Sequence, residues 1–315
     1  MKRFLLTFVA VLLMLSVISG CSIKASKTNK LKVVCTIFPQ YDFVRQIANN
    51  KVELSMLLPF GLESHDYKLE NMSIADMSTV AEADLIIYVG GESDSDWIEK
   101  LKSNVKSNAE WMALTDTVDP LSASLVEPLN HEALEHKHEH EIDEHVWTSP
   151  KRAIEIVESI TERLCTLDEA NSKTYRDNLK NYKKQLNELD NELTETVKNA
   201  KQNTLVFSDR FPFRYLCHDY KIEYAAAFTG CSALSEPTIA QINQISEAAV
   251  SSGTKYIFYM EKSNTVFAEK IASTIGIKTA MLHSCHNITR EQFEEKATYY
   301  SLMKNNLKLI SEALI

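Results

Sequence analysis

Residues 166–200 read TLDEANSKTYRDNLKNYKKQLNELDNELTETVKNA and predict a helix longer than most domain helices. Thr166 to Glu169 matches a capping box at the start of this segment. An apolar stripe follows at spacings of three and four residues, formed by Leu179, Tyr182, Leu186, Leu189, Leu193 and Val197. Such a helix would span roughly 50 Å, which suits a rod (166–201) that joins two lobes. The alternative is an ordinary surface helix with a break in it.

Expected strands alternate with expected helices on both sides of this rod. Before it, we expect strands at 31–38, 52–58, 84–89 and 111–114 and helices at 41–48, 74–81, 97–105 and 150–164. After it, we expect strands at 204–207, 222–228, 255–260 and 278–282 and helices at 213–220, 238–252, 265–275 and 298–314. Such alternation is typical of a parallel sheet wrapped by helices. The predicted fold class is therefore α/β, with two parallel-sheet lobes (31–165 and 202–315) joined by a long rigid helix.

The N-terminus has the pattern of an export signal. A basic start, Met1-Lys2-Arg3, precedes an apolar run from Phe4 to Ile18 that is short for a membrane-spanning helix. Small residues immediately before Cys21 resemble a bacterial lipobox. We therefore expect a lipoprotein signal peptide at 1–20, lipidation of Cys21 and a polar tether at 21–30. The alternative is a plain secretory signal with an incidental cysteine.

Composition narrows the class of partner. The chain has 315 residues, enough for about two domains, and 44% hydrophobic and 24% charged residues, as in soluble globular proteins. A formal charge of −9 argues against nucleic acid and suits a surface that handles cations. After Cys21 five cysteines remain with no C-x-x-C pair, so neither a disulfide framework nor a thiolate zinc site is indicated. Buried free thiols are expected. One disulfide among Cys217, Cys231 and Cys285 is the alternative.

The stretch 131–145 reads HEALEHKHEHEIDEH and holds five of the nine histidines. Imidazole and carboxylate are the ligand pair of zinc and neighbouring divalent metals. A segment this polar cannot bury a core, so we expect a mobile loop or exposed flap. Its accessory metal ligands would be His131, His136, His138 and His140. The alternative is a solvated acidic loop that is only incidentally rich in histidine.

Polar side chains stand at the ends of the expected strands, where open α/β sheets bind ligands. They are His65, Asp209, Glu261 and His283, each soon after a strand, and His145 at the end of the His-rich loop. Two lobes that face each other would bring these residues into one interlobe cleft. Three imidazoles with one or two carboxylates make a four- or five-coordinate site for a divalent metal.

Three motifs carry a family resemblance. They are LLPFGLESHDY at 57–67, ADLIIYVG at 83–90 and DEHVWTSP at 143–150. With them the chain resembles, over about residues 31 to 315, the zinc/manganese-binding solute-binding lipoproteins of bacterial ABC transporters. The resemblance implies that His65 and His145 are the first two metal ligands. It also implies a His-rich acidic loop before the second motif in zinc-binding members.

The second half departs from that family pattern. The third ligand of the family is a His or Glu after the first strand of the second lobe, where this chain has Ser208 or Asp209. The last ligand is usually an Asp after the final strand, where this chain has His283. The resemblance thus implies the set His65, His145, His283 and Asp209. Glu261 is the reserve ligand, because it could instead pair with Arg210 or Lys262, and His286 is expected to be a loop residue.

The resemblance implies a receptor that captures Zn²⁺, with Mn²⁺ as the alternative, and delivers it to the permease and ATPase subunits of an importer. We expect a monomer, lipid-anchored on the extracytoplasmic face of the cell membrane, without enzymatic activity and without nucleic acid. Three imidazoles favour zinc, since manganese prefers harder oxygen ligands. A surface zinc buffer and a metallohydrolase are the rival functions. The sequence has neither H-E-x-x-H nor G-x-S-x-G, and no catalytic base can be identified.

Overall fold

The computed structural model describes residues 30–105, 108–121, 142–228 and 237–315. The chain divides into two units, Met1–Lys30 and Leu31–Ile315, and the fold lies within the second. The expected signal peptide, Cys21, and the His-rich loop as far as Glu141, with its four accessory histidines, lie outside the described residues. Within the described ranges, no helix combines the length and the apolar character that a bilayer crossing requires.

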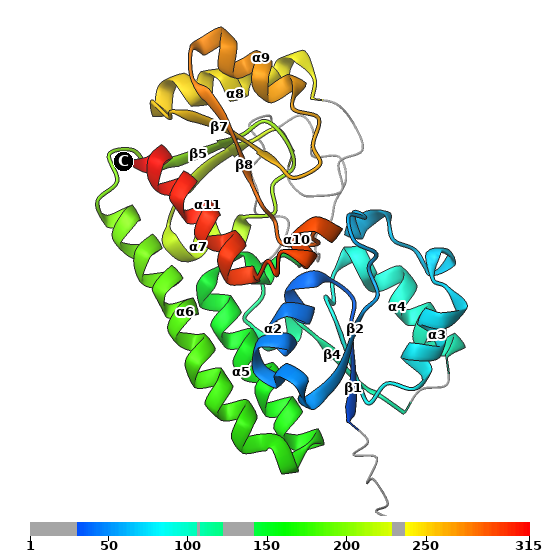
Figure 1. The fold of residues 1–315 in the computed structure, drawn as a ribbon. Coiled ribbons are helices and arrows are strands. Elements are labelled where there is room, and N and C mark those ends of the chain that lie inside the picture. The colour runs from blue at the N-terminus through cyan, green and yellow to red at the C-terminus, as the bar shows by residue number, and fades with distance from the viewer. Residues whose placement is uncertain (1–29, 106–107, 122–141, 229–236) are drawn as a thin grey trace, which may run out of the picture. The chain divides into compact units, whose positions relative to one another are not determined.

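The first half contains a four-stranded sheet in which every strand pair is parallel, in the order β2-β1-β3-β4. Its strands are β1 (Leu31–Cys35), β2 (Val52–Met56), β3 (Leu85–Tyr88) and β4 (Glu110–Ala113). Its helices are α2 (Phe38–Ala48), α3 (Ile74–Ala81) and α4 (Glu92–Asn104) (Figure 1). Helix α2 begins three residues earlier than expected. Pro39 lies in its first turn, where the missing N–H of proline costs no hydrogen bond.

The second half repeats this parallel strand order, β6-β5-β7-β8. Its strands are β5 (Thr204–Phe207), β6 (Glu223–Ala226), β7 (Tyr256–Met260) and β8 (Lys278–Leu282). Its helices are α7 (Arg214–Tyr220), α8 (Ile239–Ser252), α9 (Val266–Ile275), the unexpected α10 (Arg290–Glu294), and α11 (Tyr299–Leu314). The chain therefore has the predicted α/β fold with two parallel sheets.

Both faces of the second sheet are covered, as a parallel sheet requires. Along β5, successive side chains point to opposite faces. Val206 joins a core cluster with residues of α8 and α9, whereas Leu205 and Phe207 join the larger core that includes α11. In Figure 1, α8 and α9 lie on one side of this sheet and α11 on the other.

The rod is helix α6 (Ser172–Lys198), which follows α5 (Pro150–Leu167) after the short turn Glu169–Asn171. The capping box expected at Thr166 is wrong, because α5 continues past this residue and its hydroxyl donates to Glu162 O at 3.0 Å. The stripe is confirmed in its middle part: Tyr182, Leu186, Leu189 and Leu193 are buried.

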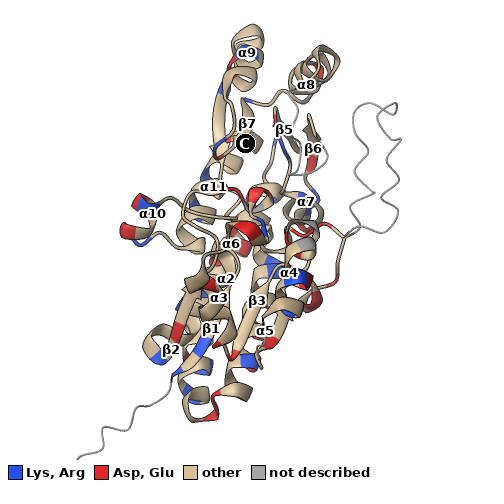
Figure 2. Cartoon of the chain, turned by 90° about the vertical axis from the view of Figure 1, so that its right-hand side faces the viewer, with Lys and Arg blue, Asp and Glu red and all other residues tan. Residues whose placement is uncertain are grey.

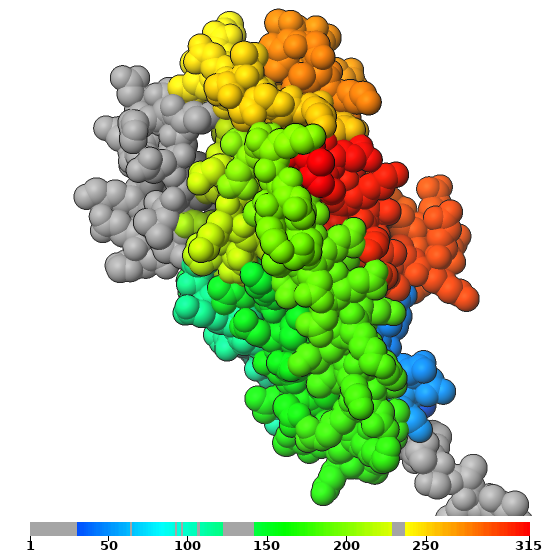
Figure 3. All heavy atoms as spheres, turned by 90° about the vertical axis from the view of Figure 1, so that its left-hand side faces the viewer, coloured from blue at the N-terminus to red at the C-terminus, as the bar shows by residue number. Residues whose placement is uncertain are grey.

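Helix α6 packs against α2 and α5 of the first half and against α11 of the second. Figure 3 shows its green residues running along one face, beside the red residues of α11. Its 27 residues span roughly 40 Å. One helix thus contributes to the cores of both halves. The described cysteines Cys35, Cys165, Cys217 and Cys285 are free and buried, and Cys231 lies outside the described residues.

Candidate metal centre

Four side chains from distant parts of the chain converge at the ends of the two sheets. They are His65, Glu144, His145 and His286, and one ligand atom from each lies within 4.8 Å of the others. His65 lies in the turn Ser64–Asp66 after β2, and Glu144 and His145 precede the turn Val146–Thr148 before α5. His286 lies in the loop between β8 and α10. The group thus gathers residues that follow the carboxyl ends of strands in both halves, as open α/β sheets favour.

The imidazole rings of this group are close and inclined to one another. Ring centroids are 6.2 Å apart for His65 and His145, 5.6 Å for His65 and His286, and 4.9 Å for His145 and His286. Oε1 of Glu144 lies 3.6 Å from Nε2 of His65. Glu144, His145 and His286 are each 4% exposed.

Several polar atoms of the group are buried without a hydrogen-bond partner among the described residues. They are Nε2 of His65, Nε2 of His286 and Oε1 of Glu144. A buried polar atom that lacks a partner costs free energy, of the order of 1–3 kcal/mol. Lone pairs that converge at such a cost are the signature of a ligand site, and here they fit a cation.

Helix α4 holds the carboxylate of Glu144. The backbone N–H of Ser93 donates to Oε2 of Glu144 at 2.8 Å and its hydroxyl donates to the same atom at 2.9 Å. Ser93 lies in the first turn of α4, where the helix dipole favours a negative charge. These bonds leave Oε1 directed to His65. Burial raises the pKa of Glu144, and the nearby His145 opposes this rise.

Gly91 is required next to this carboxylate. A Cβ atom at position 91 would lie 2.3 Å from both Cβ and Oε2 of Glu144. No real Cβ contact is this short, so any side chain at this position would displace Glu144 from the group.

His145 is oriented by its neighbour Asp143. Oδ1 of Asp143 accepts the backbone N–H of His145 at 2.9 Å and lies 2.8 Å from its ring Nδ1. A carboxylate oxygen accepts hydrogen bonds, so Nδ1 carries the proton and Nε2 keeps its lone pair. Tyr215 holds this segment in turn, because its hydroxyl donates to the carbonyl of Asp143 at 2.8 Å.

The loop after β8 turns sharply before it reaches the group. The side-chain amide of Asn306 accepts the backbone N–H of His283 and donates to its carbonyl, both at 2.8 Å. Nδ1 of His283 then accepts the backbone N–H of Cys285 at 3.0 Å. Cys285 has φ of 65°, in the left-handed region. This turn directs the chain so that His286, three residues beyond His283, faces the other two imidazoles.

Contacts with the first half fix this loop in place. The indole N–H of Trp147 donates to the carbonyl of Ser284 at 2.8 Å, and the backbone N–H of Phe38 donates to the carbonyl of His286 at 3.1 Å. Further along, the side-chain amide of Asn287 donates to the carbonyls of Pro59 and Leu62. The loop is therefore bonded to Phe38, to the backbone shortly before His65 and to the side chain of Trp147, which follows His145.

The structure brings together only part of the expected ligand set. His65 and His145 lie in the group, whereas His283, Asp209 and Glu261 do not. The ring of His283 is engaged with Cys285 and lies 3.6 Å from Oε1 of Glu261. His286 was expected to be a loop residue and not a ligand. It lies in the group at the place that was expected for His283.

The two expected carboxylates of the second half have other neighbours. Oδ1 of Asp209 lies 3.8 Å from Nε of Arg210. Glu261 accepts hydrogen bonds from the backbone and hydroxyl of Ser284. Sequence reasoning missed Glu144 and His286, although Glu144 adjoins His145 and His286 is the second imidazole of Leu282–His286 (LHSCH).

Burial also sets the charge state of the imidazoles. It lowers the pKa of His65 to about 3, and the neighbouring His145 and the positive Arg210 act in the same direction. Burial likewise lowers the pKa of His286 well below its ordinary value, again with help from the surrounding imidazoles. Both rings are therefore neutral near neutral pH, and the neutral ring is the form that binds metals.

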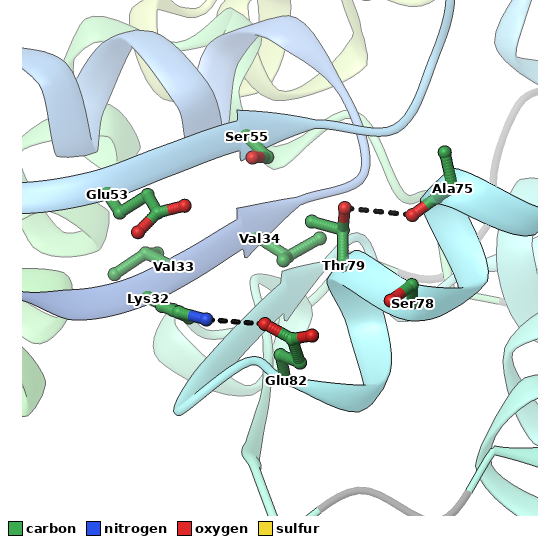
Figure 4. Close-up of a pocket in the computed structure, with 9 residues that line it drawn as sticks. All are labelled: Lys32, Val33, Val34, Glu53, Ser55, Ala75, Ser78, Thr79 and Glu82. Carbon is green, nitrogen blue, oxygen red and sulfur yellow. Dashed lines mark hydrogen bonds and ion pairs between the residues drawn. The ribbon is translucent and has the colours of Figure 1, made fainter.

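A cavity lies elsewhere in the first half, between β1, β2 and α3 (Figure 4). This cavity of about 240 Å³ contains the ion pair between Lys32 and Glu82, with N and O 2.5 Å apart. Apolar side chains, hydroxyls, carboxylates and one lysine line it, without an imidazole. Figure 2 shows acidic and basic residues interspersed over both halves in that view.

The chain is similar to known zinc-uptake proteins. The family model "Zinc-uptake complex component A periplasmic" (ZnuA) matches residues 33–313. The "Zinc-binding lipoprotein AdcA" of Streptococcus pneumoniae (strain ATCC BAA-255 / R6) is 29% identical over 294 residues, which cover 93% of this chain. The chain spans 58% of the length of that relative. The "High-affinity zinc uptake system protein ZnuA" of Bacillus subtilis (strain 168) is 29% identical over 291 residues, 92% of this chain and 89% of the relative.

Solved structures agree in fold. The crystal structure of the Zn(II)-bound ZnuA-like domain of Streptococcus pneumoniae AdcA superposes with a TM-score of 0.72 at 26% identity. The superposition covers 90% of this chain and 99% of that domain. Because the family model matches most of the chain, this protein belongs to the family "Zinc-uptake complex component A periplasmic" (ZnuA).

Proposed function

We propose that this protein captures Zn²⁺ with His65, Glu144, His145 and His286 and delivers it to the permease and ATPase subunits of an ABC importer. The observation that supports this proposal most strongly is the convergence of three imidazoles, two of them buried and that of His65 15% exposed, with one buried carboxylate. Three nitrogens and one oxygen match the usual four-coordinate zinc site of proteins. The names of the two matched relatives include zinc, which also supports Zn²⁺ as the cargo.

Manganese is the alternative cargo of the same receptor. Mn²⁺ prefers harder oxygen ligands, and a set of three imidazoles with one carboxylate offers mainly nitrogen. The predicted preference is therefore for zinc. Metal analysis of the purified full-length protein, followed by titration with Zn²⁺ and Mn²⁺ in competition, tests this order.

The proposal includes a lipid anchor at Cys21, on the extracytoplasmic face of the membrane, with the protein acting as a monomer. A relative named as a lipoprotein and the lipobox-like residues before Cys21 support it. Mass spectrometry of the mature protein would test it, since a first residue other than a lipidated Cys21 would contradict it.

A buffer that binds metal only through the His-rich loop is the rival to a receptor, and deletion of residues 131–142 separates the two. A receptor keeps one tight site after this deletion, because His65, Glu144, His145 and His286 are untouched. A buffer loses nearly all its metal. A metallohydrolase needs a catalytic base beside the metal-bound water. It is disfavoured, because Ser93 and Asp143, the groups next to the proposed ligands, are bonded to Glu144 and His145 instead.

Substitution of the ligands provides the direct test. We expect His65→Ala, His145→Ala and His286→Ala each to lose tight zinc binding in a competition titration against a chromophoric chelator. His218→Ala is the matched control, because this imidazole on α7 has 58% of its side chain exposed and its ring pairs with Asp219. Parental zinc affinity in His286→Ala would contradict the ligand set.

A further inference from the structure

The two ring nitrogens of His286 have different surroundings. Nε2 is buried without a hydrogen-bond partner among the described residues, whereas Nδ1 lies 2.6 Å from the hydroxyl oxygen of Ser284. A neutral imidazole carries one proton, on one nitrogen only, and the other nitrogen keeps a lone pair. The hydrogen bond at Nδ1 therefore decides whether Nε2 can bind a metal.

The hydroxyl of Ser284 has a single proton, and Glu261 accepts it. Oε1 of Glu261 accepts the Ser284 hydroxyl, and Oε2 accepts the backbone N–H of Ser284 at 2.9 Å. Both carboxylate oxygens thus act as acceptors. With its proton directed to Glu261, the Ser284 oxygen can only accept at its contact with His286. It follows that Nδ1 of His286 carries the proton and Nε2 keeps its lone pair.

We infer that Glu261 acts on metal capture through Ser284, as a positioning residue that holds His286 in the Nδ1–H form with Nε2 available to the metal. This inference rests on the proposed function, since it assumes that His286 is a ligand. Glu261 was expected as a reserve ligand, and here it acts one hydroxyl away from the ligand. His145 has a similar arrangement without the intervening hydroxyl, because Asp143 contacts its Nδ1 directly. Such partners orient a metal-binding imidazole and raise its basicity.

The register of the second sheet explains why these residues meet. Strands β7 and β8 pair in parallel with Met260 opposite Leu282, so Glu261 and His283 leave the sheet side by side. Ser284 follows directly and meets the carboxylate. The indole of Trp147 holds the Ser284 carbonyl from the first half. We call Glu261, Ser284 and His286 the relay. The register of β7 and β8 fixes the position of Glu261 relative to Ser284, and Trp147 of the first half fixes the backbone of Ser284.

Glu261→Gln tests the relay by reversing one hydrogen bond. The amide of Gln can donate to the Ser284 oxygen, and the Ser284 proton then turns to Nδ1 of His286. The ring proton would move to Nε2, and zinc affinity should fall by about 10–100-fold, as for other groups that orient metal ligands. Ser284→Ala should weaken binding in the same direction, and Ser284→Thr, which keeps the hydroxyl, should restore it.

The matched control is Ser149→Ala. Ser149 is as buried as Ser284, and its hydroxyl donates to Oδ2 of Asp219 at 2.7 Å, so the substitution also removes a buried hydroxyl-to-carboxylate bond. We expect parental zinc affinity in this variant. Two readouts are measured for every protein: zinc affinity by competition with a chromophoric chelator, and the tautomer of His286 by long-range ¹H–¹⁵N NMR of the metal-free protein.

The parent should show the Nδ1–H tautomer at His286, and Glu261→Gln should shift it toward Nε2–H while affinity falls. Parental affinity and tautomer in both Glu261→Gln and Ser284→Ala would overturn the relay. A loss of affinity with an unchanged tautomer would also overturn it, because a merely structural effect gives that result. If His286→Ala keeps parental zinc affinity, it is the proposed ligand set that fails.

Discussion

Arg210 donates from Nη1 to Oε2 of Glu63 at 3.2 Å and thereby joins the segment after β5 to the loop after β2 that carries His65. Both side chains are largely buried, with 15% and 22% exposed. Burial raises the pKa of Glu63, and the positive charge of Arg210 opposes this rise. The pair links the two halves of the fold immediately beside the metal centre.

We expect this ion pair to stabilise the fold measurably. Arg210→Gln should lower the free energy of unfolding by roughly 1–3 kcal/mol, because Glu63 would remain largely buried without its charged partner. A double-mutant cycle with Glu63→Gln, measured by urea unfolding, should give a coupling of at least about 0.5 kcal/mol. Additive single effects would show that the pair contributes nothing.

Substitution of His283 distinguishes it from His286. His283→Ala should keep tight zinc binding, because this imidazole lies outside the ligand group. It should lower the free energy of unfolding by about 1 kcal/mol, since the backbone N–H of Cys285 loses its acceptor. Calorimetric titration with zinc and urea unfolding measure the two effects. Complete loss of tight binding in His283→Ala, together with unchanged binding in His286→Ala, would reverse the assignment.

Gly91→Ala should weaken zinc binding without direct contact to the metal. The new methyl group collides with Cβ and Oε2 of Glu144 and displaces its carboxylate. We expect a loss of at least about 10-fold in affinity, as for other changes that misplace a ligand. Gly253→Ala is the control: it strains a left-handed turn with φ of 67°, and its Cβ would meet nothing within 4 Å. The control should lose stability and keep parental affinity.

The stability of the metal-free protein should depend on pH through His65. Its pKa is about 3 when folded, because of burial, and about 6.5 in an unfolded chain. Between these values only the unfolded chain binds the proton, so stability falls as pH is lowered from about 6.5 toward 3. His65→Gln removes this effect.

The difference between parent and His65→Gln is therefore the quantity to measure, by urea unfolding with a chelator present. The parent should lose roughly 2 kcal/mol relative to the variant between about pH 7 and about pH 5, from about 1.4 kcal/mol per pH unit below the unfolded pKa. An equal difference at both pH values would show that His65 titrates normally in the folded protein.

Local patterns in the sequence were enough to predict most elements of the fold. Strands β5 and β8 and helix α3 have the expected bounds, and the apolar stripe from Tyr182 to Leu193 is buried as expected. Apolar periodicity reports burial over a few neighbouring residues, which is why these assignments succeed. The start of α6 was misplaced, because Thr166 lies in the last turn of α5 and its hydroxyl donates to the carbonyl of Glu162 there.

For the candidate metal centre, the sequence by itself predicted His65 and His145, since each lies in a distinctive motif next to a strand end or a helix start, and both lie in the group. Only the tertiary structure shows that His286, and not His283, lies in the group with them. That choice depends on Asn306, which holds the backbone of His283, and on Phe38, which binds the carbonyl of His286. Glu144 likewise faces the group because Ser93 binds it and Gly91 leaves space. These partners are distant along the chain, so no local pattern records the direction in which either side chain points.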